Sequence, residues 1–195
     1  MKKIGLYFGT FNPIHVGHLI IANHLANNSD LTEVWFVVSP HNPLKDKNTL
    51  LDDHHRLAMV QRAVDDNPKL KASSIEFDLP KPSYTVLTLQ SLKEKFPKTE
   101  FSLIMGEDNL RTIHKWKNYE YILENFDIYV YPRVQSATET DVKDFSNSGR
   151  IHMCNAPVMN VSSTFIREAI KNRKDVRYLL TDPVFKYVDE MNFYK

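Results

Sequence analysis

Short apolar runs alternate with longer segments of helical spacing along most of this chain, and this alternation constrains the fold more than any other feature. Residues 4–8 form an apolar run, residues 9–13 are rich in turn formers, and residues 14–27 have helical spacing before a β-branched run at 33–38. The pattern recurs, with helices expected over 54–64, 85–96 and in short segments around Trp116, and strands near 70–77, 101–105, 126–131 and 151–154. Alternation of this kind predicts an α/β fold, a doubly wound parallel sheet with helices on both faces.

No Pro/Gly/Ser-rich linker and no repeat divides the 195 residues. We therefore expect a single domain over residues 1–195, a size at which one core buries most of the apolar surface. The polar stretch 135–149 is expected to be a surface excursion between two strands. From about residue 162 the chain is expected to be helical, with Asp182 and Pro183 starting a last helix. The apolar face of that helix is predicted to include Val184, Tyr187, Val188 and Met191.

Charge and cysteine content narrow the classes of function. The 25 Lys and Arg residues nearly balance the 24 Asp and Glu residues, so the formal net charge of +1 gives no general attraction for nucleic acid. We expect small-molecule substrates. Cys154 is the only cysteine, which excludes an intrachain disulfide and a multi-cysteine zinc site and suits the cytoplasm. No apolar stretch reaches the roughly 18 residues of a membrane span, and the run after Lys3 is too short for a signal peptide.

The turn after the first strand carries the residues with the clearest chemistry. It reads Gly-Thr-Phe-Asn-Pro-Ile-His-Val-Gly-His over residues 9–18. His15 and His18 are three residues apart, so both imidazoles project from one side of the first helical turn, where backbone N–H groups and the helix dipole favour anions. Gly9 lets the chain bend towards a ligand, and Gly17 leaves space beside the imidazoles. An isolated His-x-x-His is more often an ordinary surface or core pair, and a metal pair is a second alternative. The position between a strand and a helix favours phosphate binding.

Two later motifs supply further groups that are suited to binding phosphate. Ser-Pro-His-Asn-Pro-Leu-Lys ends at Lys45 and follows the second strand, and its prolines make a semi-rigid arm for an ammonium group. Ser162, Ser163 and Thr164 offer N-cap hydroxyls at the start of a helix, and Arg167 lies one turn later with a planar fork of donors. Capping alone would explain the hydroxyls, and an exposed surface position would explain Lys45 or Arg167 taken singly.

Together these motifs resemble the nucleotidylyltransferase superfamily. The turn at 9–18 is similar to its signature, and Val-Ser-Ser-Thr-Phe-Ile-Arg at 161–167 is similar to its second box. Pro-Ser-Tyr-Thr at 82–85, Met-Gly-Glu-Asp at 105–108 and Trp116 look like those of the bacterial nicotinate-nucleotide adenylyltransferases, and the landmarks span almost the whole chain. The resemblance implies a Rossmann-like nucleotidyltransferase fold and transfer of AMP from ATP to nicotinate mononucleotide. The products would be deamido-NAD and pyrophosphate, in NAD biosynthesis.

The same resemblance implies roles for the residues of the phosphate site. His18 would stabilise the α-phosphate in the transition state, while His15 and Lys45 hold the triphosphate. Thr10 and Arg167 would complete the clamp. Mg²⁺ is expected to arrive with ATP, bound mainly by phosphates and water, so no dedicated metal site is expected. The residues expected to contact the nucleotide are Gly9, Thr10, Phe11, Gly17, Gly106, Asp108, Ser162, Ser163 and Thr164.

On the acceptor side, the resemblance implies that Tyr84 and Trp116 stack on the nicotinate ring and that Thr85 also binds the acceptor.

Asp108 is expected to accept a hydrogen bond from a ribose hydroxyl, although a helix N-cap would explain it equally well. Two positions depart from the family pattern. Phe8 stands where many members have glycine, and Leu87 stands where an acid is common. These departures leave the acceptor preference and the local loop shape open.

Other functions fit parts of this pattern. A pantetheine-phosphate adenylyltransferase would generally have threonine at the position of His15, and a non-catalytic nucleotide sensor could dispense with groups needed mainly in the transition state. A cytidylyltransferase or a small tRNA-ligase-like domain would carry a second motif that is not seen here. The spacing does not distinguish nicotinate from nicotinamide mononucleotide as the acceptor, nor a monomer from a homo-oligomer.

Overall fold

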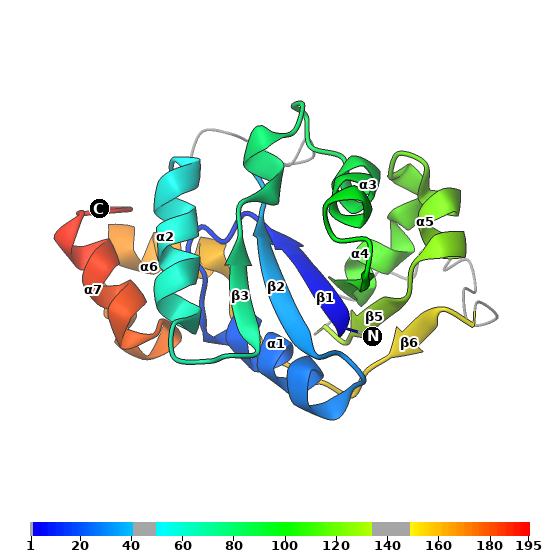
Figure 1. Cartoon of the computed structure of the whole chain (residues 1–195). Coiled ribbons are helices and arrows are strands. Elements are labelled where there is room, and N and C mark those ends of the chain that lie inside the picture. Colours follow the sequence, from blue (N-terminus) through cyan, green and yellow to red (C-terminus); the bar gives the residue numbers. More distant parts are fainter. Residues whose placement is uncertain (1, 41–49, 134–148) are drawn as a thin grey trace.

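A parallel sheet of six strands forms the centre of the molecule (Figure 1). The computed structural model describes residues 2–40, 50–133 and 149–195. The strands lie in the order β3-β2-β1-β4-β5-β6, and each neighbouring pair is parallel. Their bounds are β1 Lys2–Gly9, β2 Glu33–Val38, β3 Leu70–Ser73, β4 Thr99–Gly106, β5 Ile128–Tyr131 and β6 Ile151–Met153. This is the strand order of a doubly wound, Rossmann-like sheet, so the predicted α/β fold is confirmed.

The strand order reverses between β1 and β4. Leu6 of β1 lies opposite Trp35 of β2 on one side and Leu103 of β4 on the other. Residues 4–7 of β1 are buried, as expected for a parallel strand that is covered on both faces. In sheets of this kind, ligands bind outside the carboxyl ends of the strands at the point of reversal. The turn after β1 and the segment after β4 both lie at this edge.

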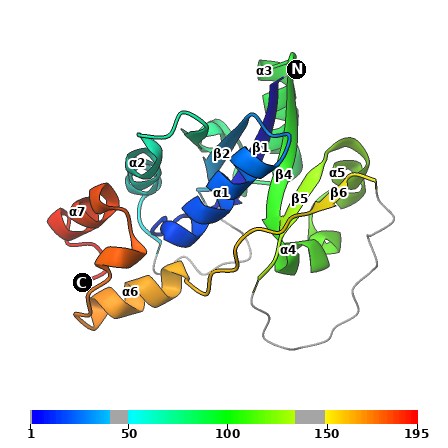
Figure 2. The ribbon, with the colours of Figure 1, turned by 90° about the horizontal axis from the view of Figure 1, so that it is seen from below.

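Four helices cover one face of the sheet and share one apolar core (Figures 1 and 2). They are α1 Val16–Asn28, α2 Asp53–Val64, α6 Ser163–Lys171 and α7 Asp182–Glu190, with a short 3₁₀ turn, η3 Arg177–Leu179, between the last two. Leu25, Met59, Ile166 and Val184 contribute one buried side chain from each helix. This core joins the C-terminal helices to the N-terminal half of the chain, so it brings the start of α6 close to the turn after β1.

The other face carries a second core under α3 Thr85–Lys95, α4 Glu107–Arg111, η2 Ile113–Lys115 and α5 Tyr119–Asn125. Leu89, Leu110 and Ile122 of these helices belong to one buried cluster with Leu103 and Ile128 of the sheet. Because each of these segments follows a parallel strand, α3 and α5 begin near the carboxyl edge of the sheet. The sequence motifs at the starts of both helices therefore lie at the edge where the ligand is expected.

The strand expected near 70–77 is shorter than predicted. β3 ends at Ser73, and residues 75–78 form the 3₁₀ turn η1 Ile75–Asp78, which begins with a hydrogen bond from the Phe77 N–H to the Ser74 carbonyl at 2.8 Å. The reason is the buried carboxylate of Glu76, which accepts a hydrogen bond from the Thr88 hydroxyl of α3 at 2.7 Å. A strand continued through Glu76 would not place this carboxylate against α3.

The last helix also differs in one detail from the prediction. Val184 and Val188 are buried as expected, but Met191 lies at the end of α7 and is 44% exposed. Phe193 and Tyr194 pack against the core in its place. The prediction for Met191 was wrong because α7 ends at Glu190, so its helical spacing no longer determines which side chains face inward.

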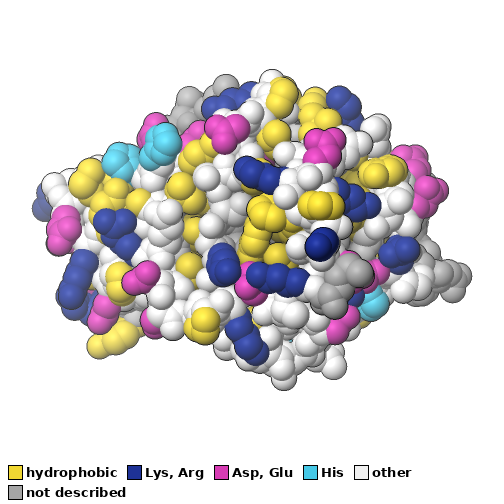
Figure 3. Space-filling model, in the orientation of Figure 1, with side chains coloured by type: hydrophobic (Ala, Val, Ile, Leu, Met, Phe, Trp, Pro, Cys, Tyr) yellow, Lys and Arg dark blue, Asp and Glu magenta, His cyan; other side chains and the backbone are white. Residues whose placement is uncertain are grey.

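Acidic and basic side chains are interspersed over the face of the molecule shown in Figure 3, in keeping with the balanced net charge. In the described ranges, no helix has the length and apolarity needed to cross a membrane. Most of the polar stretch 135–149 lies outside the described residues.

Candidate active site

The turn after β1 is built around Phe11. The Phe11 backbone lies in the left-handed region, with φ at 46°, which a bulky residue rarely adopts. The buried ring makes edge contacts with Tyr7 and Phe36, with centroid distances of 5.9 and 5.4 Å. A Cβ at Gly9 would lie only 2.8 Å from this ring. The space at Gly9 is therefore filled by Phe11, and the glycine is needed for that packing.

His15 and His18 lie face to face at the start of α1. Their rings are stacked with centroids 3.7 Å apart and an interplanar angle of 25°. The backbone N–H of His15 donates to Nδ1 of His18 at 3.3 Å. Because a backbone N–H can only donate, Nδ1 of His18 is the acceptor, and the neutral ring carries its proton on Nε2. A Cβ at Gly17 would lie 3.1 Å from Nδ1 of His15, so this glycine leaves room for the imidazole as predicted.

His15 is uncharged near neutral pH because it is buried. Burial lowers the pKa of His15 to about 4, and the positive charge of Arg133 acts in the same direction. Its Nδ1 atom is shielded from solvent. The ring also takes part in a capping box at the start of α1, in which the side chains of His15 and His18 each accept from the backbone N–H of the other residue.

The start of α6 is joined directly to the turn. Arg167 donates from Nη1 to the Asn12 carbonyl at 2.9 Å and from Nη2 to the Thr164 hydroxyl at 3.4 Å. The Ser163 hydroxyl donates to the Pro13 carbonyl at 2.8 Å. Ser162 caps the helix, since its hydroxyl accepts from the Phe165 N–H at 3.2 Å. The tertiary structure thus brings the second motif against the first across about 150 residues of chain.

The side chain of Asn12 collects further contacts within the turn. The Tyr194 hydroxyl, from the last residues of the chain, donates to Asn12 Oδ1 at 2.7 Å, and the Leu51 N–H donates to the same atom at 3.4 Å. Asn12 is buried. Sequence reasoning missed Tyr194, because a tyrosine near the end of the chain carries no local sign of a contact with residue 12.

Arg56 is a second residue that sequence reasoning missed. It is fully buried in α2, and its guanidinium bonds to backbone carbonyls that include that of Thr10 in the turn, at 2.7 Å. A signal was present, because Arg56 shares helical spacing with the buried residues Met59, Val60 and Ala63. A charged residue at a position that faces the core is unusual and points to a specific set of partners.

The ends of β4 and β5 supply the groups opposite the turn. Arg133 donates from Nη1 to Asp108 at 2.9 Å, and both side chains are about half exposed. A Cβ at Gly106 would lie 2.5 Å from the Asp108 carboxylate, so the glycine gives this side chain its room. Between this pair and the histidines, the buried Tyr7 hydroxyl donates to the Tyr131 hydroxyl at 3.0 Å. Arg133, Tyr7 and Tyr131 were not predicted as site residues.

The expected acceptor residues lie on the α3 and α5 face. Tyr84 and Thr85 stand at the start of α3, and Trp116 follows η2. The ammonium of Lys117 lies 4.5 Å from the Tyr84 ring centroid, so the segment that holds Trp116 contacts the start of α3. Both aromatic residues are half-buried and pack against the second core, as do the two residues that depart from the family pattern, Phe8 and Leu87.

Lys45 lies outside the described residues, so its predicted place over the phosphates stays a prediction. In the part of the chain that the structure describes, no group of three or more His, Cys, Asp or Glu side chains could hold a metal ion. Hydrogen bonds join Ser163 and Arg167 of α6 to the turn after β1. The other predicted residues that the structure describes lie in this turn, at the start of α6 or on the segments that follow β3 and β4.

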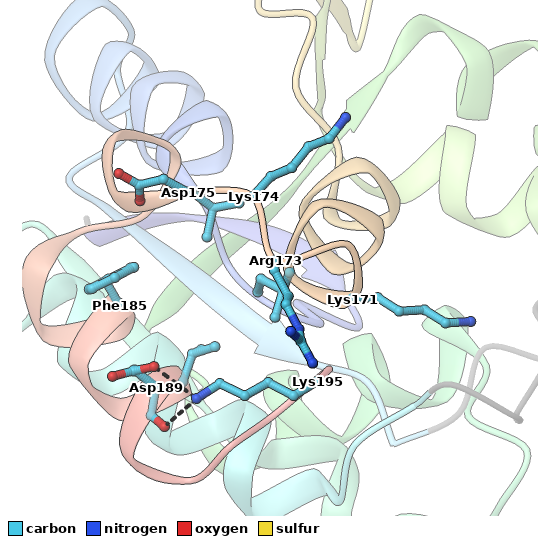
Figure 4. Close-up of a pocket in the computed structure, with 10 residues that line it drawn as sticks. Lys171, Arg173, Lys174, Asp175, Phe185, Asp189 and Lys195 are labelled. Atoms are coloured by element: carbon cyan, nitrogen blue, oxygen red, sulfur yellow. Dashed lines mark hydrogen bonds and ion pairs between the residues drawn. The ribbon is translucent and has the colours of Figure 1, made fainter.

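A separate groove of about 560 Å³ lies between the end of α6 and α7 (Figure 4). Its floor is apolar, and several basic residues stand around it. Figure 4 shows Lys171 and Lys174 pointing in different directions, while Lys195 is directed at Asp189, with which it forms an ion pair of 2.9 Å. These cations do not converge on one point. Unlike the turn that holds His15 and His18, the groove therefore does not direct several side chains to one ligand position.

Sequence comparison identifies close relatives of the chain. The pattern of the cytidylyltransferase-like family matches residues 6–169. A protein of Flavobacterium psychrophilum named "Probable nicotinate-nucleotide adenylyltransferase" is 64% identical over 193 residues, which is 99% of each chain. A protein of the same name from Bacteroides fragilis is 42% identical over 95% of this chain and 90% of its own length. The match therefore extends over the whole described site.

Among solved structures, the chain is similar to nicotinic acid mononucleotide adenylyltransferase of Plasmodium falciparum complexed with NaAD. The TM-score is 0.82 at 20% identity, over 100% of this chain and 98% of that one. A second structure of that protein, complexed with APC, has a TM-score of 0.79 at 19% identity. These matches establish the fold, and the sequence relatives establish the family. The chain belongs to the cytidylyltransferase-like family and, within it, to the nicotinate-nucleotide adenylyltransferases.

Proposed function

We propose that this protein transfers the AMP group of ATP to nicotinate mononucleotide, giving deamido-NAD and pyrophosphate. The observation that carries the proposal is the stacked pair of His15 and His18 at the carboxyl edge of the sheet, joined to Arg167 through the Asn12 carbonyl. This arrangement occurs in a chain that is 64% identical to a named nicotinate-nucleotide adenylyltransferase. The related fold of the P. falciparum enzyme has been solved with NaAD and with APC, which supports a nucleotide site.

In the proposed reaction, a phosphate oxygen of the acceptor attacks the α-phosphorus of ATP. The bond from that phosphorus to the oxygen bridging to the β-phosphate breaks, and pyrophosphate leaves on the opposite side. No covalent enzyme intermediate is required, so the protein contributes position and charge. His18 is suited to this role because the turn holds its ring proton on Nε2, from which it would donate to a non-bridging oxygen of the α-phosphate.

The remaining phosphate contacts are proposed on the same edge. His15 would lie against the triphosphate, with its ring stacked on that of His18. Arg167 has five N–H donors, and its contacts to Asn12 and Thr164 hold the fork in place while further donors reach the phosphates. Lys45 and Thr10 would complete the clamp, with Ser163 bound to the Pro13 carbonyl as part of its support.

The two nucleosides are proposed to lie on either side of the strand reversal. Asp108, held by Arg133, would accept a hydrogen bond from a ribose hydroxyl, with Gly106 leaving room beside it. Tyr84 and Trp116 would stack on the pyridine ring of the acceptor, with Thr85 next to them. The ammonium of Lys117 next to the Tyr84 ring favours a ring that carries a carboxylate, which supports nicotinate over nicotinamide. The remaining proposed nucleotide contacts are Gly9, Phe11, Gly17, Ser162 and Thr164.

Mg²⁺ is proposed to enter with ATP. It would be held mainly by phosphate oxygens and water. The ion would neutralise part of the triphosphate charge. The residues of this chain would then bind the oxygens that remain.

The reaction is tested with purified protein, ATP and Mg²⁺ supplied with nicotinate mononucleotide, nicotinamide mononucleotide or phosphopantetheine, with products identified by mass. We expect pyrophosphate release and an adenylylated product with nicotinate mononucleotide at a higher kcat/KM than with the other two. Preferred use of phosphopantetheine would favour the pantetheine-phosphate alternative. ATP binding without product from any acceptor would point to a nucleotide sensor and would refute the proposal.

Several broader expectations stay proposals of the same kind. We propose that residues 1–195 act as one domain, because the C-terminal helices share a core with α1 and α2. We propose a cytoplasmic location, on the basis of the single cysteine and the intracellular nature of the proposed substrates. The expectation of small-molecule substrates without nucleic acid rests on the balanced charge.

A further inference from the structure

Arg56 has an unusual environment for a charged residue. Its side chain is fully buried, yet among the described residues it forms an ion pair with a single carboxylate, that of Asp53. Its other partners are backbone carbonyls: Nε donates to Leu51 at 2.9 Å, Nη1 donates to Thr10 at 2.7 Å and to Ser39 at 2.8 Å, and Nη2 donates to Pro40 at 3.1 Å. A guanidinium has five N–H donors, and all five have a partner here. None is left for a substrate.

The four carbonyls belong to three segments of the chain. Thr10 begins the histidine turn, Ser39 and Pro40 follow β2, and Leu51 precedes α2. Arg56 therefore joins the turn after β1, the residues after β2 and Leu51 through a single planar guanidinium group. The Ser39 N–H adds a bond to the Gly9 carbonyl at 2.9 Å.

We propose that Arg56 is a positioning residue for adenylyl transfer, which sets the distance between the turn after β1, the residues after β2 and Leu51 before α2, and thereby determines the affinity for ATP. The inference rests on the proposed function for its meaning, but its geometry is independent of the identity of the acceptor. Because a positioning effect at the phosphate edge acts on the triphosphate, it raises the KM for ATP without an equal effect on the acceptor.

Lysine is the informative replacement. It keeps the charge but has three donors in place of five, so at least two of the partner oxygens lose their bond. We expect Arg56→Lys to raise the KM for ATP about tenfold or more, equal to about 1.4 kcal/mol, with the KM for the acceptor changed less than about twofold. The matched control is Arg62→Lys on the same helix, an exposed arginine bonded to the Ala58 carbonyl at 3.2 Å, which should leave both constants unchanged.

Kinetics, ATP affinity by titration calorimetry and the midpoint of urea unfolding are measured for each variant. A folded Arg56→Lys with normal ATP affinity, or one that raises both KM values equally, overturns the proposal. If Arg56→Lys does not fold, Asp53→Ala decides, because it removes one partner and leaves the carbonyl bonds in place. Asp53→Ala should raise the KM for ATP about threefold and leave the KM for the acceptor nearly unchanged. An unchanged KM for ATP overturns the proposal. Calorimetry separates this result from the proposed function, since ATP binding is measured without turnover.

Discussion

The phosphate side and the acceptor side of the site are built in different ways. On the phosphate side, His15 and Asn12 are buried, and the turn is joined by hydrogen bonds to Arg56, Arg167 and Tyr194 from three different parts of the chain. On the acceptor side, Tyr84 and Trp116 are half-buried, and the main contact is the cation–π contact between Tyr84 and the exposed Lys117, at 4.5 Å.

This difference follows from the chemistry that each side performs. Stabilisation of a charged transition state requires donors that are already in place, because reorganisation during the reaction would cost the energy they supply. An exposed cation–π contact contributes only about 0.5–1 kcal/mol. We therefore expect the phosphate side to be rigid before ATP binds, and the acceptor side to adjust when the ring enters. Substitutions on the first should reduce the rate, and those on the second should mainly weaken acceptor binding.

The largest effect is expected for His18→Ala. It removes a donor to the α-phosphate that the turn holds in one tautomer, so kcat should fall by about 10²–10³. The unfolding midpoint should change little, because His18 is only half-buried. His24→Ala, on the same helix, is the control and should leave kcat unchanged. A normal kcat for His18→Ala would contradict the claim that residues of the phosphate side determine the rate.

Buried His15 predicts a second effect, on stability in acid. Its pKa is about 4 in the folded protein and about 6.5 when unfolded, so the unfolded state binds the proton first as pH falls. The part of the free energy of unfolding that depends on His15 has its full value above pH 6.5. It decreases by up to about 3 kcal/mol as the pH falls from 6.5 to 4. His15→Gln should therefore have a flatter dependence in this window, measured by urea unfolding. The exposed His114→Gln is the control, and an equal slope for His15→Gln and wild type would contradict the burial argument.

Arg167→Lys should have an intermediate effect. Lysine retains the charge but not the planar fork that bonds to the Asn12 carbonyl and the Thr164 hydroxyl, so kcat/KM for ATP should fall by about 10- to 100-fold. Lys171→Gln, exposed on the same helix, should be neutral. Steady-state kinetics with the acceptor at saturation measure this change. A rise in the KM for the acceptor alone would place Arg167 on the acceptor side of the site.

Trp116→Phe should have the smallest effect, and it tests whether Trp116 binds the acceptor. It keeps an aromatic ring against the second core but reduces the stacking area, so the KM for nicotinate mononucleotide should rise about three- to tenfold. The KM for ATP should stay constant. Trp35→Phe, whose ring contacts Phe96 and Phe101, is the matched control. If the KM for ATP rises as much as that for the acceptor, the two sides are not separate.

Much of the fold could be predicted from local pattern. The predicted strand at 33–38 agrees with β2 Glu33–Val38, and Thr85 begins α3 where it was expected. Local patterns failed where a distant partner decided the outcome. β3 is shorter than predicted because Glu76 pairs with Thr88, and Met191 is exposed because α7 ends before it.

By itself, the sequence determined which segments form strands and helices, and that His15 and His18 share one helical turn, since these depend on spacing of a few residues. It also placed Ser162 at a helix start, where it caps α6. Only the tertiary structure decided that Arg167 bonds to Asn12, that Tyr194 returns to the turn and that Arg56 is buried with five bonds. The physical reason is that most of these acceptors are backbone carbonyls. Every residue has one, so no residue type marks in advance which carbonyl a distant arginine will bind.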